Sequence, residues 1–268
     1  MEKEKIEAIR QWTNDPCDAV FAGGCEKGSR EFFEKVREYR YKRYAPWLKK
    51  LLDGLEVKGK EVLEIGCGMG NDLLTFAQNG ANATGMDLVP AHIALAQKLF
   101  EFYGCRAAIM EMDAESLSFP DDSFDLVYSF GVLHHTPNIE KAILEIHRVL
   151  RPGGKAVIGL YHKNSWHYWV NLILFHGIIK RKLFSMPIDE MLSRSVEFSR
   201  SGARPLVRVY TRDDCEVLFR DFHQLKIKTY HWRASQIPVL GKCFPFVFLP
   251  HCWGWYIFSF AVKSLKKI

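Results

Sequence analysis

The chain has 268 residues, of which 48% are apolar, and a formal net charge of +6 at pH 7. This length suits one globular domain with a substantial core, and no repeat or low-complexity segment points to a fibrous or disordered chain. Seven cysteines without a C-x-x-C pair favour reduced thiols over a disulfide framework or a zinc site, so no metal site is predicted.

The first 55 residues are predicted to form a helical cap. The chain starts with alternating Glu and Lys instead of an apolar stretch, so no signal peptide is expected and the cytoplasm is the predicted location. Tyr39, Tyr41 and Tyr44 are candidates to line the inner side of this cap, with simple packing as the alternative.

An apolar run at residues 62–65 breaks into alternating glycines at Gly66, Gly68 and Gly70. This pattern predicts a strand, a tight loop whose backbone contacts a ligand, and the N-terminus of a helix. Asn71 stands where a dinucleotide-binding loop needs its third glycine, and no Gly-Lys-Ser/Thr follows to form a phosphate loop. A dinucleotide and a nucleoside triphosphate are therefore disfavoured.

Acidic residues surround the predicted loop. Glu64 precedes the first glycine by two residues, and Asp87 and Asp113 end the next two apolar runs. Asp87 is placed to bind both hydroxyls of a ribose, the alternative being an N-cap for the helix at Pro90. For Glu64 the alternative is a surface position at a strand end. Such a cluster of anions suits a cationic nucleoside better than a pyrophosphate.

The order of elements predicts an α/β fold, a doubly wound and mostly parallel seven-stranded sheet with helical cap inserts. Apolar residues at helical spacing predict a helix over 139–150, and Thr211 is a predicted N-cap for a helix over 211–221. The last two strands are expected to pair as a hairpin. The predicted strands are residues 61–65, 82–87, 107–112, 124–129, 155–161, 224–232 and 255–262.

Several motifs in this order resemble the class I S-adenosylmethionine-dependent methyltransferases. They are EIGCGMG at 64–70, Asp87, DAESLSFPDDSFD at 113–125, VYSFGVLHH at 127–135 and LRPGG at 150–154. The resemblance covers about residues 61–161 and implies the Rossmann-like fold of that family, with S-adenosyl-L-methionine as the cofactor. It says nothing firm about the acceptor.

The resemblance also implies roles for single residues. The glycines would lie under the methionine part of the cofactor, Asp87 would bind its ribose, and Asp113 and Ala114 would flank its adenine. The full predicted set of cofactor-binding residues is Glu64, Gly66, Cys67, Gly68, Gly70, Asn71, Asp87, Leu88, Asp113, Ala114 and Ser129.

Methyl transfer needs alignment and dry surroundings, and it needs a base only when the acceptor carries a proton. His134 and His135 follow the fourth strand, where one imidazole could take that proton near neutral pH. We expect at most one of the two to be catalytic. Tyr161 and His162, at the end of the fifth strand, are further candidates.

The predicted organisation is one domain in four parts: a cap at 1–55, the cofactor-binding core at 56–161, an apolar and basic cap insert at 162–205, and a completion of the sheet at 206–268 with a lid loop at 234–254. Residues 61–150 carry 4 Lys and Arg against 13 Asp and Glu, whereas residues 151–268 carry 19 against 7. The acidic part suits a sulfonium. The basic part could face an acidic substrate, nucleic acid or an anionic membrane, or simply solvent.

The insert at 165–179 is aromatic and apolar and is followed directly by Lys180, Arg181 and Lys182. It is too short to span a bilayer and suits a membrane surface or a lid over an apolar pocket. Residues 243–262 carry no formal charge, but Pro245 and Pro250 interrupt them and their last third is a predicted strand.

Three functions remain open. The leading one is a methyltransferase for a small, hydrophobic or aromatic acceptor, because large apolar inserts enclose a site better than they hold a polymer. The second is an RNA or protein methyltransferase that uses the basic C-terminal part, although the Asn/Asp-Pro-Pro-Tyr/Phe signature of many nucleic-acid enzymes is replaced by Ser129-Phe130-Gly131-Val132. The third is a non-catalytic, membrane-associated protein that binds the cofactor.

Overall fold

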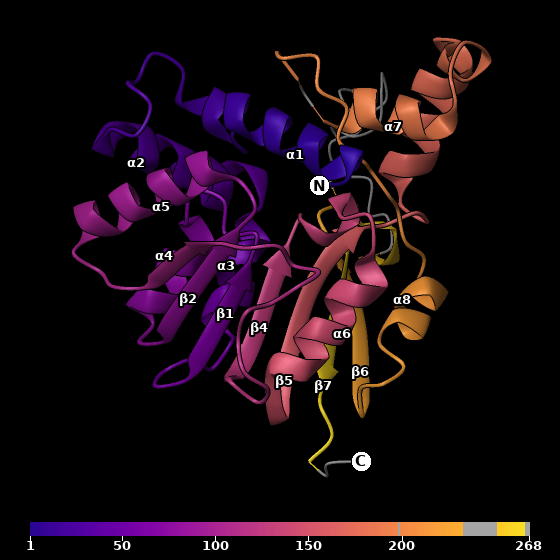
Figure 1. Cartoon of the computed structure of the whole chain (residues 1–268). Coiled ribbons are helices and arrows are strands. Elements are labelled where there is room, and N and C mark those ends of the chain that lie inside the picture. Colours follow the sequence, from indigo (N-terminus) through magenta and orange to yellow (C-terminus); the bar gives the residue numbers. More distant parts are fainter. Residues whose placement is uncertain (198, 233–250, 266–268) are drawn as a thin grey trace.

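A central seven-stranded sheet organises the computed structural model, which describes residues 1–197, 199–232 and 251–265. The strand order is β3-β2-β1-β4-β5-β7-β6; the first five strands are parallel and β7 runs antiparallel to both β5 and β6 (Figure 1). The strands are β1 Glu61–Ile65, β2 Asn82–Asp87, β3 Ala108–Glu111, β4 Phe124–Phe130, β5 Leu150–Tyr161, β6 Gln224–Tyr230 and β7 Tyr256–Val262.

Helices cover both faces of the sheet, which confirms the doubly wound α/β prediction. One face packs against α6 (Ile139–Val149) and α8 (Arg212–Leu218). The other packs against α3 (Pro46–Asp53), α4 (Asn71–Gln78), α5 (Pro90–Tyr103) and α2 (Arg30–Glu38). The apolar stripe of α6 is buried as its spacing predicts.

The remaining helical segments lie in the N-terminal cap, after β4, and between β5 and β7. They are α1 Lys3–Asn14, η1 Ala19–Ala22, η2 Tyr39–Tyr44, η3 Leu133–His135, η4 His167–Ile179, η5 Lys182–Phe184, α7 Ile188–Val196 and η7 His251–Trp253. Figure 1 shows α1 crossing above the upper ends of the central strands, while η4, η5 and α7 project from the sheet at the upper right.

Element boundaries differ from the predictions in a few places. Strand β5 begins at Leu150 instead of the predicted residue 155, because Leu150 already pairs with Phe124 and the register then shifts before Lys155. Helix α8 ends earlier than predicted, but Thr211 is its N-cap, in a capping box with Asp214.

The last two strands form the predicted antiparallel pair, with β7 inserted between β5 and β6. Residues 234–250, which make up most of the predicted lid loop, lie outside the described residues. None of the helices in the described part of the chain has the length and apolar character that a bilayer crossing requires.

Candidate active site

The glycine loop joins β1 to α4 and is held against the end of β2. The N–H of Gly66 donates to the carbonyl of Met86 (2.7 Å), and the N–H of Gly68 donates to Oδ2 of Asp87 (2.8 Å). Gly66 has a φ of +70°, and a Cβ there would lie 2.3 Å from the side chain of Val132. Only glycine fits this position, so the loop presents bare backbone to the space above it.

That space is a cavity whose empty volume is about 1090 Å³ when the open solvent at its mouth is included. It lies at the carboxyl ends of β1, β2 and β4, where parallel sheets bind ligands. The predicted cofactor-binding residues that line it are Glu64, Gly66, Cys67, Gly68, Asn71, Asp87, Leu88, Asp113 and Ala114.

Two predicted cofactor-binding residues do not line the cavity. Gly70 is the N-cap of α4 at a φ of +84°, and a Cβ there would lie 3.1 Å from Ala96 of α5. Ser129 is buried, and its Oγ donates to the carbonyl of Ile65 (2.9 Å). Both residues shape the fold beneath the cavity.

Asp87 uses its carboxylate to fix the rim of the cavity. Oδ1 accepts from the N–H of Val89 (2.9 Å) and lies 3.3 Å from Nδ1 of His92, while Oδ2 holds Gly68. Val89, and not Asp87, is the N-cap of α5. The alternative role of Asp87 as a helix cap is therefore not what the structure shows. Lone pairs remain on both oxygens for further donors.

The acidic groups around the cavity are unevenly neutralised. Arg40 makes a bidentate pair with Asp72 (2.9 and 2.7 Å) and reaches Asp18 (3.3 Å). Tyr41 and Tyr128 also donate to Asp72. Burial alone would raise the pKa of the Asp72 carboxyl, but Arg40 and these hydrogen bonds hold it below its usual range.

Glu64 has no such partner set. Burial raises the pKa of its carboxyl well above the usual range, and the negative charge of Asp72 adds to this effect. Its Oε2 is buried without a hydrogen-bond partner and belongs to a residue that lines the cavity. An orphaned acceptor here fits a cationic or hydrogen-bond-donating ligand group.

Helix α1 roofs the cavity. Lys5 of α1 donates to Asp113 (2.8 Å) and to Glu115 (2.9 Å). Both acceptors lie in the segment after β3, so Lys5 ties α1 to that edge of the cavity. Ala8 and Trp12, farther along the same helix, also line the cavity. The N-terminal cap therefore encloses the ligand space.

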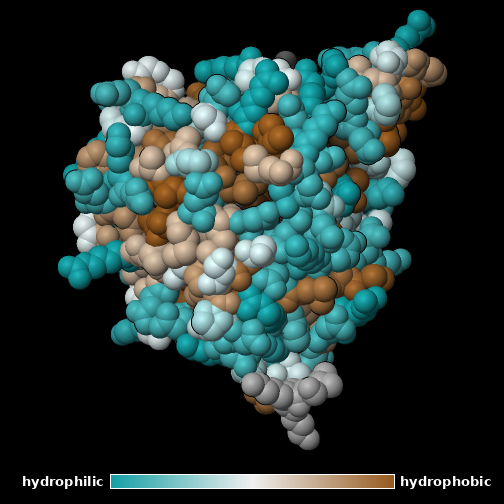
Figure 2. All heavy atoms as spheres, viewed as in Figure 1, coloured by the Kyte–Doolittle hydropathy of each residue, from teal (hydrophilic) through white to brown (hydrophobic). Residues whose placement is uncertain are grey.

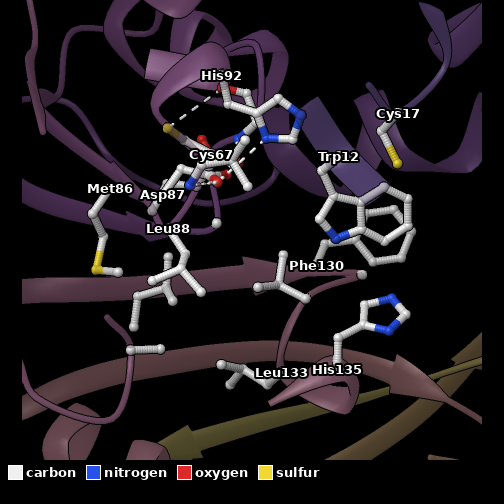
Figure 3. A pocket seen from close by; sticks show the side chains of 18 of the residues that line it. Trp12, Cys17, Cys67, Met86, Asp87, Leu88, His92, Phe130, Leu133 and His135 are labelled. Atoms are coloured by element: carbon white, nitrogen blue, oxygen red, sulfur yellow. Dashed lines mark hydrogen bonds and ion pairs between the residues drawn. The ribbon is translucent and has the colours of Figure 1, made fainter. Parts of the chain in front are cut away.

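The cavity has two chemically different ends, visible in Figure 3. Asp87, Leu88 and Met86 lie at one end, whereas Trp12 and His135 lie together at the other with Phe130 and Cys17. The rings of Trp12 and His135 meet edge to face, with centroids 5.4 Å apart. The second end is thus mostly aromatic and apolar, with one imidazole.

His135 has the geometry of a proton acceptor. Its Nδ1 lies 2.6 Å from the carbonyl oxygen of Leu206. A carbonyl can only accept, so Nδ1 carries the proton and the lone pair of the neutral ring is on Nε2. Nε2 is buried without a hydrogen-bond partner, 3.5 Å from Oε1 of Glu197, which follows α7.

The other catalytic candidates lie outside the cavity lining. His134 is fully buried and stacks on Tyr161, with ring centroids 3.7 Å apart. Burial raises the pKa of Tyr161 well above its usual range, as does the charge of Glu197, to which its hydroxyl donates (2.8 Å). His162 faces the carbonyl of Gly254 (2.9 Å).

Sequence reasoning missed Lys5, Trp12, Cys17, Arg40 and His92, all of which line the cavity. His92 had a local signal, since it lies in the first turn of the helix after Asp87. The others come from the N-terminal cap, whose position over the site depends on contacts far apart in sequence. Tyr41, a candidate to line the cap, instead bonds Asp72.

Residues 63–158 match the methyltransferase domain family. Over these residues the chain is similar to methyltransferase domains. The sequence motifs that resemble the S-adenosylmethionine-dependent class all fall within the matched range.

Curated relatives of this domain include three with named small-molecule substrates. A phthiotriol/phenolphthiotriol dimycocerosates methyltransferase of Mycobacterium leprae is 40% identical over 156 residues, which are 57% of this chain and 56% of that protein. A demethylmenaquinone methyltransferase of Thermus thermophilus is 35% identical over 42% of this chain and 52% of its own length. The sterol 4-C-methyltransferase strm-1 of Caenorhabditis elegans is 37% identical over 36% of this chain and 29% of its own length. The chain thus spans about half, or less, of these relatives.

Solved structures show the same fold. A methyltransferase from Thermotoga maritima matches with a TM-score of 0.56 and 17% identity, over 88% of this chain and 97% of that one. The [4+2]-cyclase SpnF matches with a TM-score of 0.57 and 17% identity, over 98% and 94%. Since this fold also occurs in a protein named as a cyclase, the reaction has to be argued from the domain family and the site.

The residues present fit S-adenosylmethionine. The orphaned Oε2 of Glu64 suits its cationic amino acid end, and Asp87 suits the ribose hydroxyls. Met86, Leu88 and Ala114 offer apolar surface for a purine next to Asp113. Within the described residues no group of three or more His, Cys, Asp or Glu is arranged to hold a metal ion.

Proposed function

We propose that this protein transfers a methyl group from S-adenosylmethionine to a small lipophilic acceptor. The observation that carries the proposal is the two-ended cavity under α1. Asp87 and Leu88 lie at one end, and Trp12, Phe130 and His135 lie at the other. The glycine loop and Glu64 line the same cavity. Both ends belong to one enclosed space, so a donor and an apolar acceptor would meet inside it.

The relatives support a lipophilic acceptor. Their names specify a sterol, demethylmenaquinone and phthiotriol dimycocerosates, all of which are lipophilic. In this chain the roof formed by Lys5, Ala8 and Trp12 narrows the access that a folded RNA or protein segment would need. This argument favours a small molecule over a polymer.

When bound, S-adenosylmethionine would supply an electrophilic methyl group on a sulfonium. Asp87 would hold the ribose, and the glycine loop and Glu64 would hold the methionine part, with Glu64 facing its ammonium group. The aromatic end would orient the acceptor and exclude water, and such alignment supplies roughly 7–11 kcal/mol toward the barrier in well-oriented reactions.

If the acceptor carries a proton, His135 is positioned to receive it. The lone pair on Nε2 would take the proton of the acceptor, and the carboxylate of Glu197, 3.5 Å away, would stabilise the resulting imidazolium. Tyr161 fixes that carboxylate through its hydroxyl. His134 has no path to the acceptor, because it is fully buried and does not line the cavity.

The test is incubation of the purified chain with methyl-labelled S-adenosylmethionine and a cell extract, followed by counting label in organic-soluble, aqueous and macromolecular fractions. We expect label in the organic fraction. Label in macromolecules alone would contradict the proposal and point to RNA or protein as the acceptor. Absence of label despite cofactor binding would favour a non-catalytic binding protein.

Variants make the test specific. Asp87→Ala removes charge-assisted hydrogen bonds worth about 1.5–3 kcal/mol, so cofactor affinity should fall roughly ten- to hundredfold by calorimetry. Asp121→Ala, at an exposed carboxylate outside the cavity lining, is the matched control and should bind normally.

His135→Gln should keep cofactor affinity and lower labelling by about 10²–10⁴-fold if the acceptor carries a proton.

A further inference from the structure

The insert between β5 and α8 presents an apolar face that nothing in the described part of the chain covers. Tyr168 and Leu172 of η4 are buried against the core, but other side chains of the insert point outward. The large apolar side chains that stay exposed are Trp169 (52%), Leu174 (45%), Ile178 (49%), Ile179 (61%), Phe184 (78%) and Ile188 (41%). We call these six residues the insert face.

Three consecutive cations, Lys180, Arg181 and Lys182, directly follow Ile179 of the insert face in sequence. Lys180 and Arg181 join η4 to η5, and Lys182 is the first residue of η5; Arg181 has a φ of +58°. Lys180 lies over the ring of Phe175 (4.8 Å), and Lys182 donates to Ser195 (3.0 Å). Among the described residues, no carboxylate lies within ion-pair distance of any of the three.

Some exposed cations elsewhere pair with a carboxylate one turn away, as in Arg30 with Glu34, Lys49 with Asp53 and Arg212 with Glu216. Lys180, Arg181 and Lys182 differ in that they are consecutive in sequence and directly follow an exposed apolar segment. No carboxylate of the described residues neutralises Lys180 or Arg181, so both can face an external anion, whereas burial and the nearby cations Lys180 and Arg194 lower the pKa of Lys182.

The shape of the insert leaves both features accessible. Figure 1 shows η4, η5 and α7 projecting from the sheet at the upper right. In Figure 2 brown, hydrophobic atoms gather at this projecting corner, directly beside teal, hydrophilic ones. With 13 residues η4 is too short to cross a bilayer, but it is apolar around its circumference, so the side chains left outside the core can enter the interface.

We propose that the insert face and Lys180, Arg181 and Lys182 form a docking surface for an anionic membrane. The apolar side chains would enter the boundary between headgroups and acyl chains, and the cations would contact lipid phosphates. A nucleic acid would use the cations but would leave the aliphatic side chains in water. A symmetric contact between two copies would bring the same unpaired cations toward each other.

The location of the surface suits the proposed function, although the docking does not depend on it. Helix α7 leads from this surface to Glu197, beside His135 and Tyr161. Two residues that follow Glu197 are hydrogen-bonded to α1. The carbonyl of Ser201 accepts from Arg10, and the N–H of Arg204 donates to Glu7. A docked protein would thus hold the aromatic end of its cavity near the bilayer, where a lipophilic acceptor is dissolved.

The experiment is flotation of the full chain with vesicles of phosphatidylcholine alone and of phosphatidylcholine with phosphatidylglycerol. We expect binding to the anionic vesicles that weakens with added salt. Lys180→Gln with Arg181→Gln should lower this binding about thirtyfold, because each cation near such a surface contributes about a fivefold effect. Ile179→Glu with Phe184→Glu should lower it on the order of tenfold or more.

Matched controls keep the result specific. Arg43→Gln with Lys50→Gln removes the same charge at exposed sites elsewhere, and Val217→Glu adds a charge at an exposed apolar site on α8. Both controls should bind vesicles like the unmodified chain. Unchanged Tm and unchanged binding of S-adenosylmethionine would show that each variant is folded, and neither readout needs the acceptor.

Several outcomes would overturn the proposal. One is equal binding by the unmodified chain and the insert variants, or no vesicle binding at all. Another is a dimer in the absence of vesicles that Ile179→Glu converts to a monomer, which would make the surface an interface between copies. A third is binding to a random RNA that needs Lys180 and Arg181 but not the apolar side chains.

Discussion

His134 is held where only a neutral imidazole is stable. Its ring is fully buried on Tyr161, and neither ring nitrogen has a hydrogen-bond partner. Burial lowers the pKa of His134 well below its usual value, and His135 beside it adds to this effect. The imidazole of His134 is therefore neutral in the folded state.

This burial makes stability depend on pH. Below the ordinary histidine pKa of 6.5 the unfolded chain binds a proton at His134 that the folded chain does not, so stability falls as pH decreases. His134→Phe keeps the stacked ring and removes this effect. We expect the variant to gain up to about 1.4 kcal/mol per pH unit over the unmodified chain below pH 6.5, and no pH-dependent gain at pH 8.

Thermal unfolding of both proteins between pH 5 and pH 8 measures the difference. His223→Phe, at an exposed histidine, is the control and should follow the unmodified chain. A constant gap between His134→Phe and the unmodified chain at every pH would show that packing, and not protonation, sets the effect.

Single residues of the site were predictable where the chemistry is local. Glu64 and Asp87 were proposed because they stand at the ends of apolar runs beside a glycine loop, and both line the cavity. The choice between His134 and His135 was not predictable, because adjacent residues on η3 face different surroundings. One lines the cavity and the other is buried behind it.

At the scale of elements, α1 is held as a roof by few but specific contacts. Lys5 bridges Asp113 and Glu115, Glu7 accepts from the N–H of Arg204 (2.7 Å), and Arg10 donates to the carbonyl of Ser201 (2.8 Å). The helix contributes little burial of its own, with only Ala8 and Gln11 buried.

Lys5→Met should loosen this roof while leaving the core intact. A charge-assisted hydrogen bond contributes about 1.5–3 kcal/mol, so we expect at least about a tenfold faster release of bound S-adenosylmethionine in stopped-flow measurements. Proteolysis within the first fifteen residues should accelerate as well.

Lys3→Met is the matched control, because Lys3 is an exposed cation of the same helix. It should release the cofactor at the normal rate. Equal release rates for Lys5→Met and the unmodified chain would show that α1 does not limit escape.

The elements themselves were largely predictable, whereas the placement of the cap was not. Each strand of the core ends near its predicted boundary because alternation and turn residues are local signals, and Thr211 capped its helix for the same reason. The position of α1 depends on partners more than 100 residues away, such as Asp113 and Glu115, and no local pattern specifies those pairs.

At the scale of the whole molecule, Arg40 ties the N-terminal segment to the core. Its side chain is 15% exposed, and its guanidinium pairs with Asp72 of α4 and with Asp18. Burial works against the charged form of Arg40, but the two carboxylates raise its pKa well above the usual value. The N-terminal cap is therefore attached by a charge pair that depends on both partners.

Arg40→Met should leave Asp72 as a buried charge without its cation. Removal of one partner of a buried pair costs about 3 kcal/mol, which is a decrease in Tm of roughly 6–12 °C by calorimetry. The neighbouring exposed Arg43 gives the control, and Arg43→Met should change Tm by less than about 2 °C. An equal change in both variants would contradict a structural role for the pair.

The contacts of α1 also determine when the site can be completed during folding. Arg10 and Glu7 find their partners 191 and 197 residues further along the chain. During synthesis the segment around Ser201 and Arg204 emerges long after α1, and contacts of such sequence separation form late in folding. The glycine loop and the first strands can assemble without it. A newly made chain would thus have an open cofactor site first and an enclosed one only after the insert has folded.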